Sequence, residues 1–286
     1  MNGDRRLAIL LVVPTIALLL FIVIFPMIYS IYISATSFNF VHRELTKFVY
    51  ADNFVRAFTD MRFLSSLRNT AVLVGVAVTV EFLLGLAIAL LFLEPFKGKT
   101  IALPLLLLPM MITPVTVGYM FRLIYEVRTS PINYLIGLLG FNRNIEWTTS
   151  SSTAMLSILL VDIWEWTPFM MMVLLAGIVA LPREPIEAAE VDGASGWQRM
   201  RWVTFPMLKP IVAIALLIRT LDAFKIFDSI FVVTFGGPGS ATETGSFYAY
   251  LVGFRYFQMG YGSALSYILL IIITIVTTLI ARRLFE

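Results

Sequence analysis

The chain has 286 residues, of which 59% are hydrophobic and only 14% are charged, and its mean hydropathy is +0.89. This composition excludes an ordinary soluble domain, in which about 25% of residues are charged. Its apolar runs are about 20 residues or longer, which favours membrane-crossing helices over the roughly ten-residue alternations of a β-barrel. We therefore expect an all-α membrane protein.

The cysteine and histidine counts exclude disulfide, thiol and metal sites, and the distribution of charge argues against nucleic-acid binding. The chain has no cysteine and a single histidine, His42. A disulfide framework, a thiol nucleophile and a thiolate metal site are therefore absent, and one histidine cannot build a metal centre alone. The net charge is +3, but the basic residues are scattered among loops instead of forming one basic face, so nucleic acid is not an expected partner.

Six apolar segments predict six transmembrane helices, each long enough to cross about 30 Å of hydrocarbon. The first is too long for the apolar part of a signal peptide, about 7 to 15 residues. Prolines within the segments predict kinks. We find no internal repeat or linker, so we expect a single transmembrane domain over 1–286. The predicted spans are about 7–34, 70–93, 101–125, 153–181, 207–235 and 262–281.

The distribution of Lys and Arg predicts the orientation of the chain in the membrane. If both termini are cytosolic, the inner segments are short and dense in Lys and Arg, as the positive-inside rule requires. The longest outer loop would then be Ala35–Asn69, which mixes positive and negative side chains. We interpret this loop as a solvated cap, with a docking surface as the alternative.

The stretch 182–206, between the fourth and fifth predicted spans, has the features of a docking helix. Pro185 suits the first turn of a helix, and Glu184 and Glu187 complement its N-terminal dipole. Gly193 permits a sharp change of direction between two short helices. An ordinary amphipathic helix at the membrane surface is the alternative. Small residues that would let another protein approach closely are Ala188, Ala189 and Ala194.

This stretch resembles the EAA loop of binding-protein-dependent ABC importer permeases. The residues that carry the resemblance are Glu187, Ala188, Ala189, Asp192, Gly193, Ala194 and Pro206. In that family the loop forms a coupling helix that sits in a groove of a cytosolic ATPase and transmits its closure to the membrane helices. The resemblance implies a type I ABC importer permease fold and a transport subunit that is not itself an enzyme.

The resemblance extends over nearly the whole chain and is closest to maltose-type carbohydrate permeases. Further matches are Trp164 with Pro168, the stretch 197–201, and Gly236–Pro238 with Thr242. The Gly-Gly-Pro segment resembles the first of the two permeases in such importers. The implied setting is a bacterial or archaeal cytoplasmic membrane, and the implied partners are a second permease, a cytosolic ABC ATPase dimer, an extracytoplasmic sugar-binding protein and membrane lipid.

Nucleotide binding is not expected on this chain. Gly98-Lys99-Thr100 resembles the end of a phosphate-binding loop, but Leu93 occupies the position where that loop needs a glycine. The sequence also predicts no strand before this segment. We interpret the segment as a basic turn. This chain is therefore expected to bind no cofactor, and ATP and Mg²⁺ belong to the partner ATPase.

The fourth predicted span carries a candidate substrate face. Asp162, Glu165, Trp166 and Phe169 are spaced by three, four and seven residues, which places them on one side of a helix. Carboxylates accept hydrogen bonds from hydroxyls, and aromatic rings offer flat apolar surface to a sugar ring. An aromatic belt or simple helix packing is the alternative. The resemblance implies that this stretch faces substrate.

The fifth predicted span carries four charges at intervals of three: Arg219, Asp222, Lys225 and Asp228. Alternating signs at this spacing let neighbours pair on one helix. Because such a stripe turns by about 60° per step, its two ends are not expected to face the same lumen. We therefore expect structural pairing to account for much of the stripe.

The resemblance implies that Arg219, Ala223 and Ile226 lie on the substrate side of this span. Glu81 and Arg122, in the second and third predicted spans, are expected to form a pair between helices.

The resemblance thus implies a permease that forms half of the translocation pathway of an ATP-driven importer for a mono-, di- or oligosaccharide, such as one of the trehalose or maltose type, or a polyol. The paired charges mildly favour a neutral solute, because an anion would need unpaired cations. An importer for glycerol 3-phosphate or a related solute is the first alternative. An ion-coupled secondary carrier, with intramembrane carboxylates as coupling sites, is a more remote one. A non-transporting scaffold would not need an alanine-rich docking loop.

Overall fold

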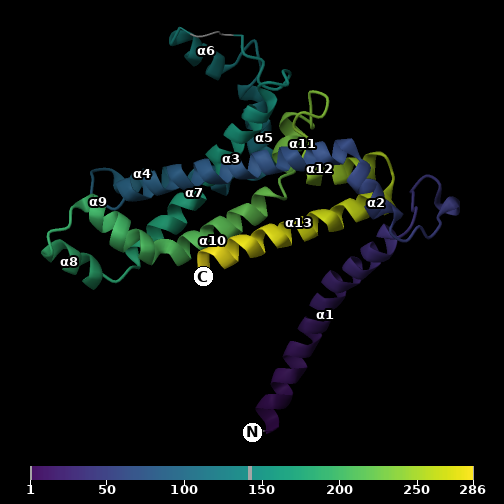
Figure 1. Cartoon of the computed structure of the whole chain (residues 1–286), viewed down its shortest axis with the longest axis horizontal. Coiled ribbons are helices and arrows are strands. Elements are labelled where there is room, and N and C mark those ends of the chain that lie inside the picture. The colour runs from purple at the N-terminus through teal and green to yellow at the C-terminus, as the bar shows by residue number, and fades with distance from the viewer. Residues whose placement is uncertain (1, 141–143, 286) are drawn as a thin grey trace. The chain divides into compact units, whose positions relative to one another are not determined.

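The computed structural model describes residues 2–140 and 144–285, and these are almost entirely helical. Figure 1 labels the helices. They are α1 (Asn2–Ser34), α2 (Asp52–Thr59), α3 (Met61–Leu91), α4 (Lys99–Met111), α5 (Pro114–Ile124), α6 (Pro131–Leu138), α7 (Ala154–Val179), α8 (Glu184–Val191), α9 (Gly196–Arg199), α10 (Phe205–Ala223), α11 (Asp228–Val233), α12 (Gly245–Tyr250) and α13 (Met259–Phe285), with π-helical turns at Met200–Thr204 and Leu251–Arg255.

Within the described residues, four helices are long and apolar enough to cross a membrane. They are Ile9–Ser34, Met61–Leu91, Ala154–Val179 and Met259–Arg283. A fifth span results if α4 and α5 are counted together, although their axes differ by 97°. These helices confirm the expected all-helical membrane architecture, whereas the count of six spans stays a prediction.

The bend between α4 and α5 follows from proline. Ile112 and Thr113 have extended backbones, with ψ of 144° and 139°, directly before Pro114. A residue that precedes proline is pushed out of the helical region by the proline ring, so the helix ends there. Pro114 then occupies the first turn of α5, where its missing N–H is tolerated.

The predicted span 207–235 is divided in the structure. Helix α10 ends at Ala223, and α11 begins only at Asp228. The four residues between them are not helical, although Lys225 and Ile226 still donate backbone hydrogen bonds to Asp222 and Ala223. This interruption decides where the charged residues of the segment point.

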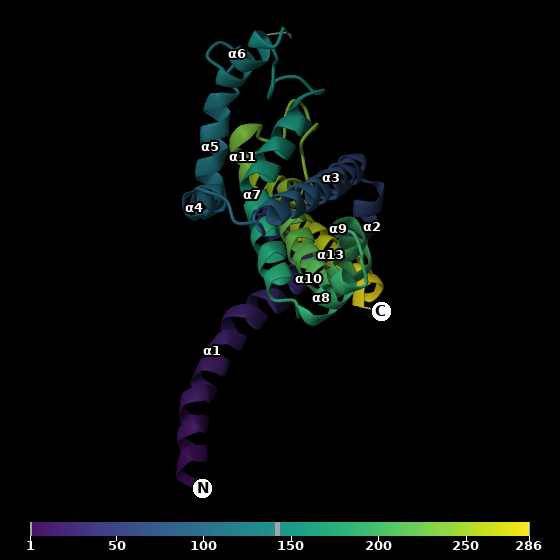
Figure 2. The ribbon, with the colours of Figure 1, turned by 90° about the vertical axis from the view of Figure 1, so that its left-hand side faces the viewer.

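The chain forms two compact units, residues 1–64 with 248–271 and residues 65–247 with 272–286. In the second unit α7 packs against α4, α5, α10 and α11, and Figure 2 shows α11 beside α5. Gly85 on α3 allows a close approach to α7, since a Cβ there would lie 2.9 Å from Met170 Cβ. The buried centre of this packing is Ala89, Met170, Met171, Leu174, Ile178, Leu208, Val212 and Ala215.

The first unit includes most of the predicted outer loop, which is largely folded. Asn53 donates hydrogen bonds to the carbonyls of Ser34 and Thr36 at 2.9 and 2.8 Å, which fixes the chain after α1. Asp60 begins α3, because its Oδ1 accepts from the backbone N–H groups of Arg62 and Phe63. The loop is therefore shorter than predicted, because α3 begins at Met61 and not near Thr70.

The same Asp60 joins distant segments within this unit. Its Oδ2 accepts hydrogen bonds from the hydroxyls of Tyr248 and Tyr261, each at 2.7 Å. The guanidinium of Arg56 lies 4.0 Å from the ring centre of Tyr261. Partial burial raises the pKa of Asp60, but the hydrogen bonds from the two tyrosines and the two backbone N–H groups outweigh it, and the net pKa lies below the ordinary value.

Candidate functional site

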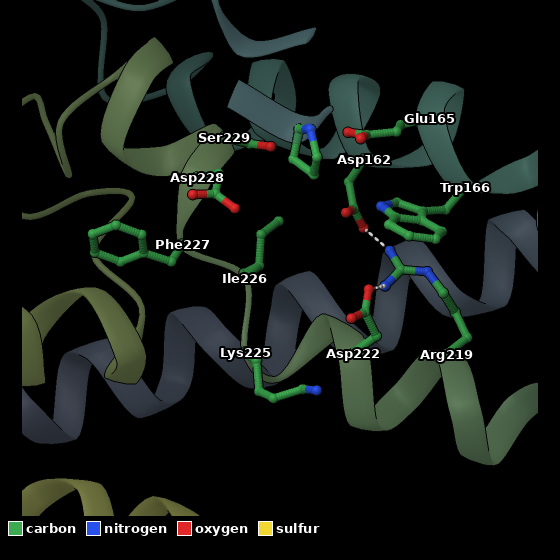
Figure 3. A pocket seen from close by; sticks show the side chains of 11 residues that line it. Asp162, Glu165, Trp166, Arg219, Asp222, Lys225, Ile226, Phe227, Asp228 and Ser229 are labelled. Carbon is green, nitrogen blue, oxygen red and sulfur yellow. Dashed lines mark hydrogen bonds and ion pairs between the residues drawn. The ribbon is translucent and has the colours of Figure 1, made fainter. Parts of the chain in front are cut away.

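A polar cavity lies between α7, α10, α11 and the connection from α10 to α11. Its volume is about 160 Å³. Figure 3 shows the residues that line it, with Asp162, Glu165 and Trp166 from α7 opposite Arg219 and Asp222 from α10. The full lining is Pro114, Asp162, Glu165, Trp166, Arg219, Asp222, Lys225, Ile226, Phe227, Asp228 and Ser229.

One buried guanidinium organises the cavity wall. Arg219 is 1% exposed and donates to both carboxylate oxygens of Glu81, at 2.6 Å from Nε and 2.9 Å from Nη2. It also donates to Asp162 and, at 3.4 Å, to Asp222. Its guanidinium carbon lies 5.2 Å from the ring centre of Trp166. Arg219 therefore connects α3, α7 and α10, and its charge is more than balanced by carboxylates.

The expected pair of Glu81 with Arg122 is wrong. Glu81 is fully buried and bound to Arg219, while Arg122 donates to the backbone carbonyl of Val232 at 3.4 Å. The cause is the 97° bend before α5, which packs α5, and Arg122 with it, against α11. Since Glu81 and Arg219 are 138 residues apart, no local spacing could have indicated their contact.

The predicted face of the fourth span is present on α7. Asp162, Glu165 and Trp166 line the cavity, and the Trp166 ring contacts the Phe169 ring edge-on with centres 6.3 Å apart. Phe169 lines a neighbouring hollow of about 360 Å³ that it shares with Trp166 and Arg219. The sequence spacing predicts this face correctly because α7 runs without a break from Ala154 to Val179.

The prediction that the two ends of the fifth-span stripe face different ways is wrong. Arg219, Asp222, Lys225 and Asp228 all line the same cavity. The stripe would turn this way only on one continuous helix, whereas α10 ends at Ala223 and the non-helical link carries the chain around the cavity. Of the expected neighbour pairs, Arg219 with Asp222 is confirmed.

The two apolar residues that the resemblance placed on the substrate side are separated by the same break. Ile226 lines the cavity. Ala223 is 1% exposed and packs with Val74 and Val78 in a hydrophobic cluster instead. Three lining residues, Pro114, Phe227 and Ser229, are not among the predicted substrate-pathway residues, and the structure brings them to the cavity through the proline bend and the break after α10.

The predicted docking loop forms two short helices joined by a tight turn. Helix α8 ends at Val191, and Gly193 follows with φ of 77°, a conformation that favours glycine. The N–H of Gly193 donates to the carbonyl of Glu190 at 3.0 Å, and that of Ala194 donates to the carbonyl of Ala189 at 2.9 Å. This is the Schellman pattern of a helix C-terminus. The sharp turn expected at Gly193 is therefore present.

The second helix of the loop leads directly into the cavity wall. Ser195 and Gln198 form a capping box at the start of α9, and Arg199 forms an ion pair with Glu190 of α8 at 2.7 Å. Helix α9, the π-turn Met200–Thr204 and α10 follow one another without a gap, and Pro206 lies in the first turn of α10. One continuous segment, 196–223, thus joins the loop to Arg219.

Large apolar side chains on this loop are exposed. Val191 is 88% exposed, Trp197 is 72% exposed and Trp202 is 70% exposed. Arg201 lies near the Trp202 ring, 5.4 Å from its centre. Exposed tryptophans beside a cation are typical of surfaces that bind another protein or the membrane interface.

Long apolar helices, a polar cavity walled by them and an exposed helical loop define a multi-pass membrane transport protein. The model of the family described as "Binding-protein-dependent transport system inner membrane component" matches residues 81–286, and the chain belongs to this family. The chain is therefore a transmembrane permease of the ABC transporter class, as the EAA resemblance implied.

Individual relatives are also named as permeases of transport systems. The chain is 33% identical to the trehalose/maltose transport system permease protein MalF of Thermococcus litoralis, over 98% of this chain and 95% of that protein. It is 35% identical to the trehalose transport system permease protein SugA of Mycobacterium tuberculosis, over 92% of this chain and 84% of that protein. A crystal structure of a bacterial ABC transporter that imports alginate, an acidic polysaccharide, shares the fold, with a TM-score of 0.85 at 22% identity over 99% of this chain and 97% of that one.

Proposed function

We propose that this chain is one of two permease subunits of an ATP-driven importer for a carbohydrate. It would supply half of the translocation pathway, and a second permease would supply the other half. A cytosolic ABC ATPase dimer would bind ATP and Mg²⁺, and an extracytoplasmic binding protein would deliver the sugar. Both termini would lie in the cytosol of the cell whose cytoplasmic membrane holds the complex.

The observation that carries the proposal is the continuous path from the exposed loop to the polar cavity. A partner that moves α8 also moves α9, because Glu190 and Arg199 are paired at 2.7 Å. The motion then passes along 196–223 to Arg219 and Asp222 at the cavity wall. Coupling of this kind needs a rigid element that two sites both act on.

The carbohydrate assignment rests on the cavity and on the relatives. Carboxylates, a tryptophan and a serine line a space in the membrane-spanning part of the chain, and these groups suit hydroxyls and sugar rings. Both curated relatives described above are named for disaccharides. Glycerol 3-phosphate suits the cavity less well, because Arg219 is already engaged by three carboxylates.

The test is ATP-dependent uptake by the reconstituted complex of both permeases, the ATPase and the binding protein, with a panel of neutral sugars. Gly193→Asp is expected to uncouple hydrolysis from uptake, since it forces a side chain into φ of 77° at the turn. Gly140→Asp is the matched control, because Gly140 has φ of 86° and equally open surroundings in another loop. Absence of nucleotide-dependent uptake for every sugar would refute the proposal.

An ion-coupled carrier is the second candidate, and one observation favours it: Glu81, Asp162 and Glu165 are buried carboxylates in membrane-spanning helices. Uptake would then depend on an ion gradient and persist without ATP. Dissipating the gradient with an ionophore while ATP is present separates the two mechanisms.

A further inference from the structure

The cavity described above is lined by more acidic than basic side chains. Four carboxylates line it, those of Asp162, Glu165, Asp222 and Asp228, against two cations, Arg219 and Lys225. A fifth carboxylate, that of Glu81, contacts Arg219 from α3. Because Arg219 is engaged by three of these carboxylates, little of its positive field is left for a ligand.

Glu165 differs from the other buried acids. It is 1% exposed and lines the cavity, yet in residues 2–140 and 144–285 no group forms a hydrogen bond or ion pair with its carboxylate. Figure 3 shows Asp162 and Asp222 joined to Arg219 by dashed lines, with Glu165 on the same wall and no such line. Because this carboxylate borders the cavity and has no partner in these ranges, a donor on a bound ligand can reach it and would stabilise this site.

The ligand donors that fit are uncharged hydroxyls and ammonium groups. A hydroxyl or an ammonium can donate to a carboxylate, whereas a uronate, sulfonate or phosphate group presents only acceptors and a like charge. Like charges repel strongly where water is scarce. The cavity wall thus has the composition of a charge filter.

We propose that this cavity selects saccharides by charge: Glu165 accepts a hydrogen bond from a hydroxyl or ammonium group of the sugar, and the surplus carboxylates reject acidic saccharides. This inference rests on the proposed function and narrows its substrate class to neutral and amino sugars. Asp162 is then a positioning residue that holds Arg219, and Glu165 is the residue that touches the ligand.

The test measures binding to the purified complex of both permeases with the ATPase, without the binding protein, so that its own specificity does not interfere. The probes are trehalose, its mono-amino derivative and its mono-uronic acid, which differ at one carbon only. Trehalose and the amino sugar are expected to bind at least about tenfold more tightly than the uronic acid. Glu165→Gln is expected to reduce that difference to about threefold or less.

The control is Glu126→Gln, because Glu126 is an exposed acid outside the cavity lining, and this variant should keep the wild-type order. Glu165→Gln could fail to assemble, which size-exclusion chromatography would show. In that case Asp228→Asn is expected to reduce the difference in affinity between trehalose and the uronic acid. Equal binding of trehalose and uronic acid to the wild type would overturn the inference. An equal change in affinity for all three probes in Glu165→Gln would also overturn the inference, since a purely structural role of Glu165 predicts equal changes.

The outcomes also separate this inference from the proposed function. If ATP-dependent sugar uptake occurs but acidic and neutral sugars bind alike, the charge filter is wrong and the importer stands. If no sugar is taken up with ATP, the importer is wrong and the filter falls with it.

Discussion

Arg219 donates to both carboxylate oxygens of Glu81, at 2.6 and 2.9 Å, and the two side chains are 1% and 0% exposed. A bidentate pair of this kind fixes the plane of the guanidinium. The pair connects α3 with α10 across 138 residues of sequence, and through Arg219 it reaches Asp162 on α7. The orientation of the cavity wall therefore depends on a residue, Glu81, that does not line the cavity.

We predict that Glu81→Gln destabilises the permease by roughly 3 kcal/mol, because the glutamine NH2 group would face a guanidinium N–H in place of one carboxylate oxygen and leave buried donors without an acceptor. The measurement is thermal or denaturant unfolding of the detergent-purified permease pair. Glu94→Gln, which alters an exposed acid after α3, is the control and should change stability by less than about 0.5 kcal/mol. A similarly small change in Glu81→Gln would show that the ion pair of Glu81 with Arg219 is not required for stability.

The sequence predicted the features that depend on local pattern. The apolar segments, the proline kinks, the turn at Gly193 and the shared face of Asp162 and Glu165 all follow from composition or from the period of one unbroken helix. The structure agrees on the bend at Pro114, on the turn at Gly193, which has the positive φ expected of a turn glycine, and on the face of the continuous helix α7, whereas the six spans and the other proline kinks stay predictions.

The features that were missed depend on where helices end and how they turn. No proline or glycine marks the break after Ala223, so the sequence predicts one helix from Arg219 to Asp228. The sequence favours Arg122 of the next predicted span as the partner of Glu81, but the bend before α5 carries Arg122 away. Such contacts are fixed by packing and not by spacing.

We predict that the contribution of Asp60 to stability depends on pH. Burial alone would raise its pKa, but hydrogen bonds from Tyr261, Tyr248 and two backbone N–H groups together outweigh burial and hold the pKa below the ordinary value in the folded protein. A lowered native pKa stabilises the fold above the unfolded pKa of about 3.9, and this is lost as pH falls through the native pKa. Asp60→Asn should therefore be less stable than wild type near neutral pH, by roughly 1 kcal/mol.

The measurement is the melting temperature of both proteins in buffers from about pH 7 down to about pH 3. The difference between them should shrink as the buffer becomes more acidic. Asp52→Asn, at an exposed acid in the first turn of α2, serves as the control. A constant difference at every pH would mean that hydrogen-bond geometry, and not the charge of Asp60, stabilises this unit.

Two glycines of α3 provide a matched pair for testing how closely α3 packs on α7. A Cβ at Gly85 would lie 2.9 Å from atoms of Met170, whereas a Cβ at Gly75 would meet nothing within 4 Å. Gly85→Ala is expected to destabilise the protein by about 1 to 3 kcal/mol through overpacking. Gly75→Ala is expected to be neutral or stabilising by up to about 1 kcal/mol, because alanine favours the helix. Equal effects on the melting temperature would contradict the close packing.

The ion pair of Glu190 with Arg199 joins the two short helices of the predicted docking loop. The pair is 2.7 Å long and connects α8 to α9, and the Glu190 side chain is 65% exposed. Since exposed pairs contribute only about 0 to 1 kcal/mol, Glu190→Lys should scarcely alter the melting temperature. It should nevertheless lower the ratio of sugar uptake to ATP hydrolysis severalfold, because α8 would no longer move α9 and α10 with it.

The exchange variant, Glu190→Lys combined with Arg199→Glu, restores opposite charges and is expected to recover most of that ratio. Uptake and hydrolysis would be measured on the same proteoliposomes, at low and at high salt, because an exposed pair is screened by ions. If the exchange variant is as uncoupled as the single one, the two residues act through separate contacts with the ATPase. Recovery at low salt that is lost at high salt would assign the coupling between the two helices to this ion pair.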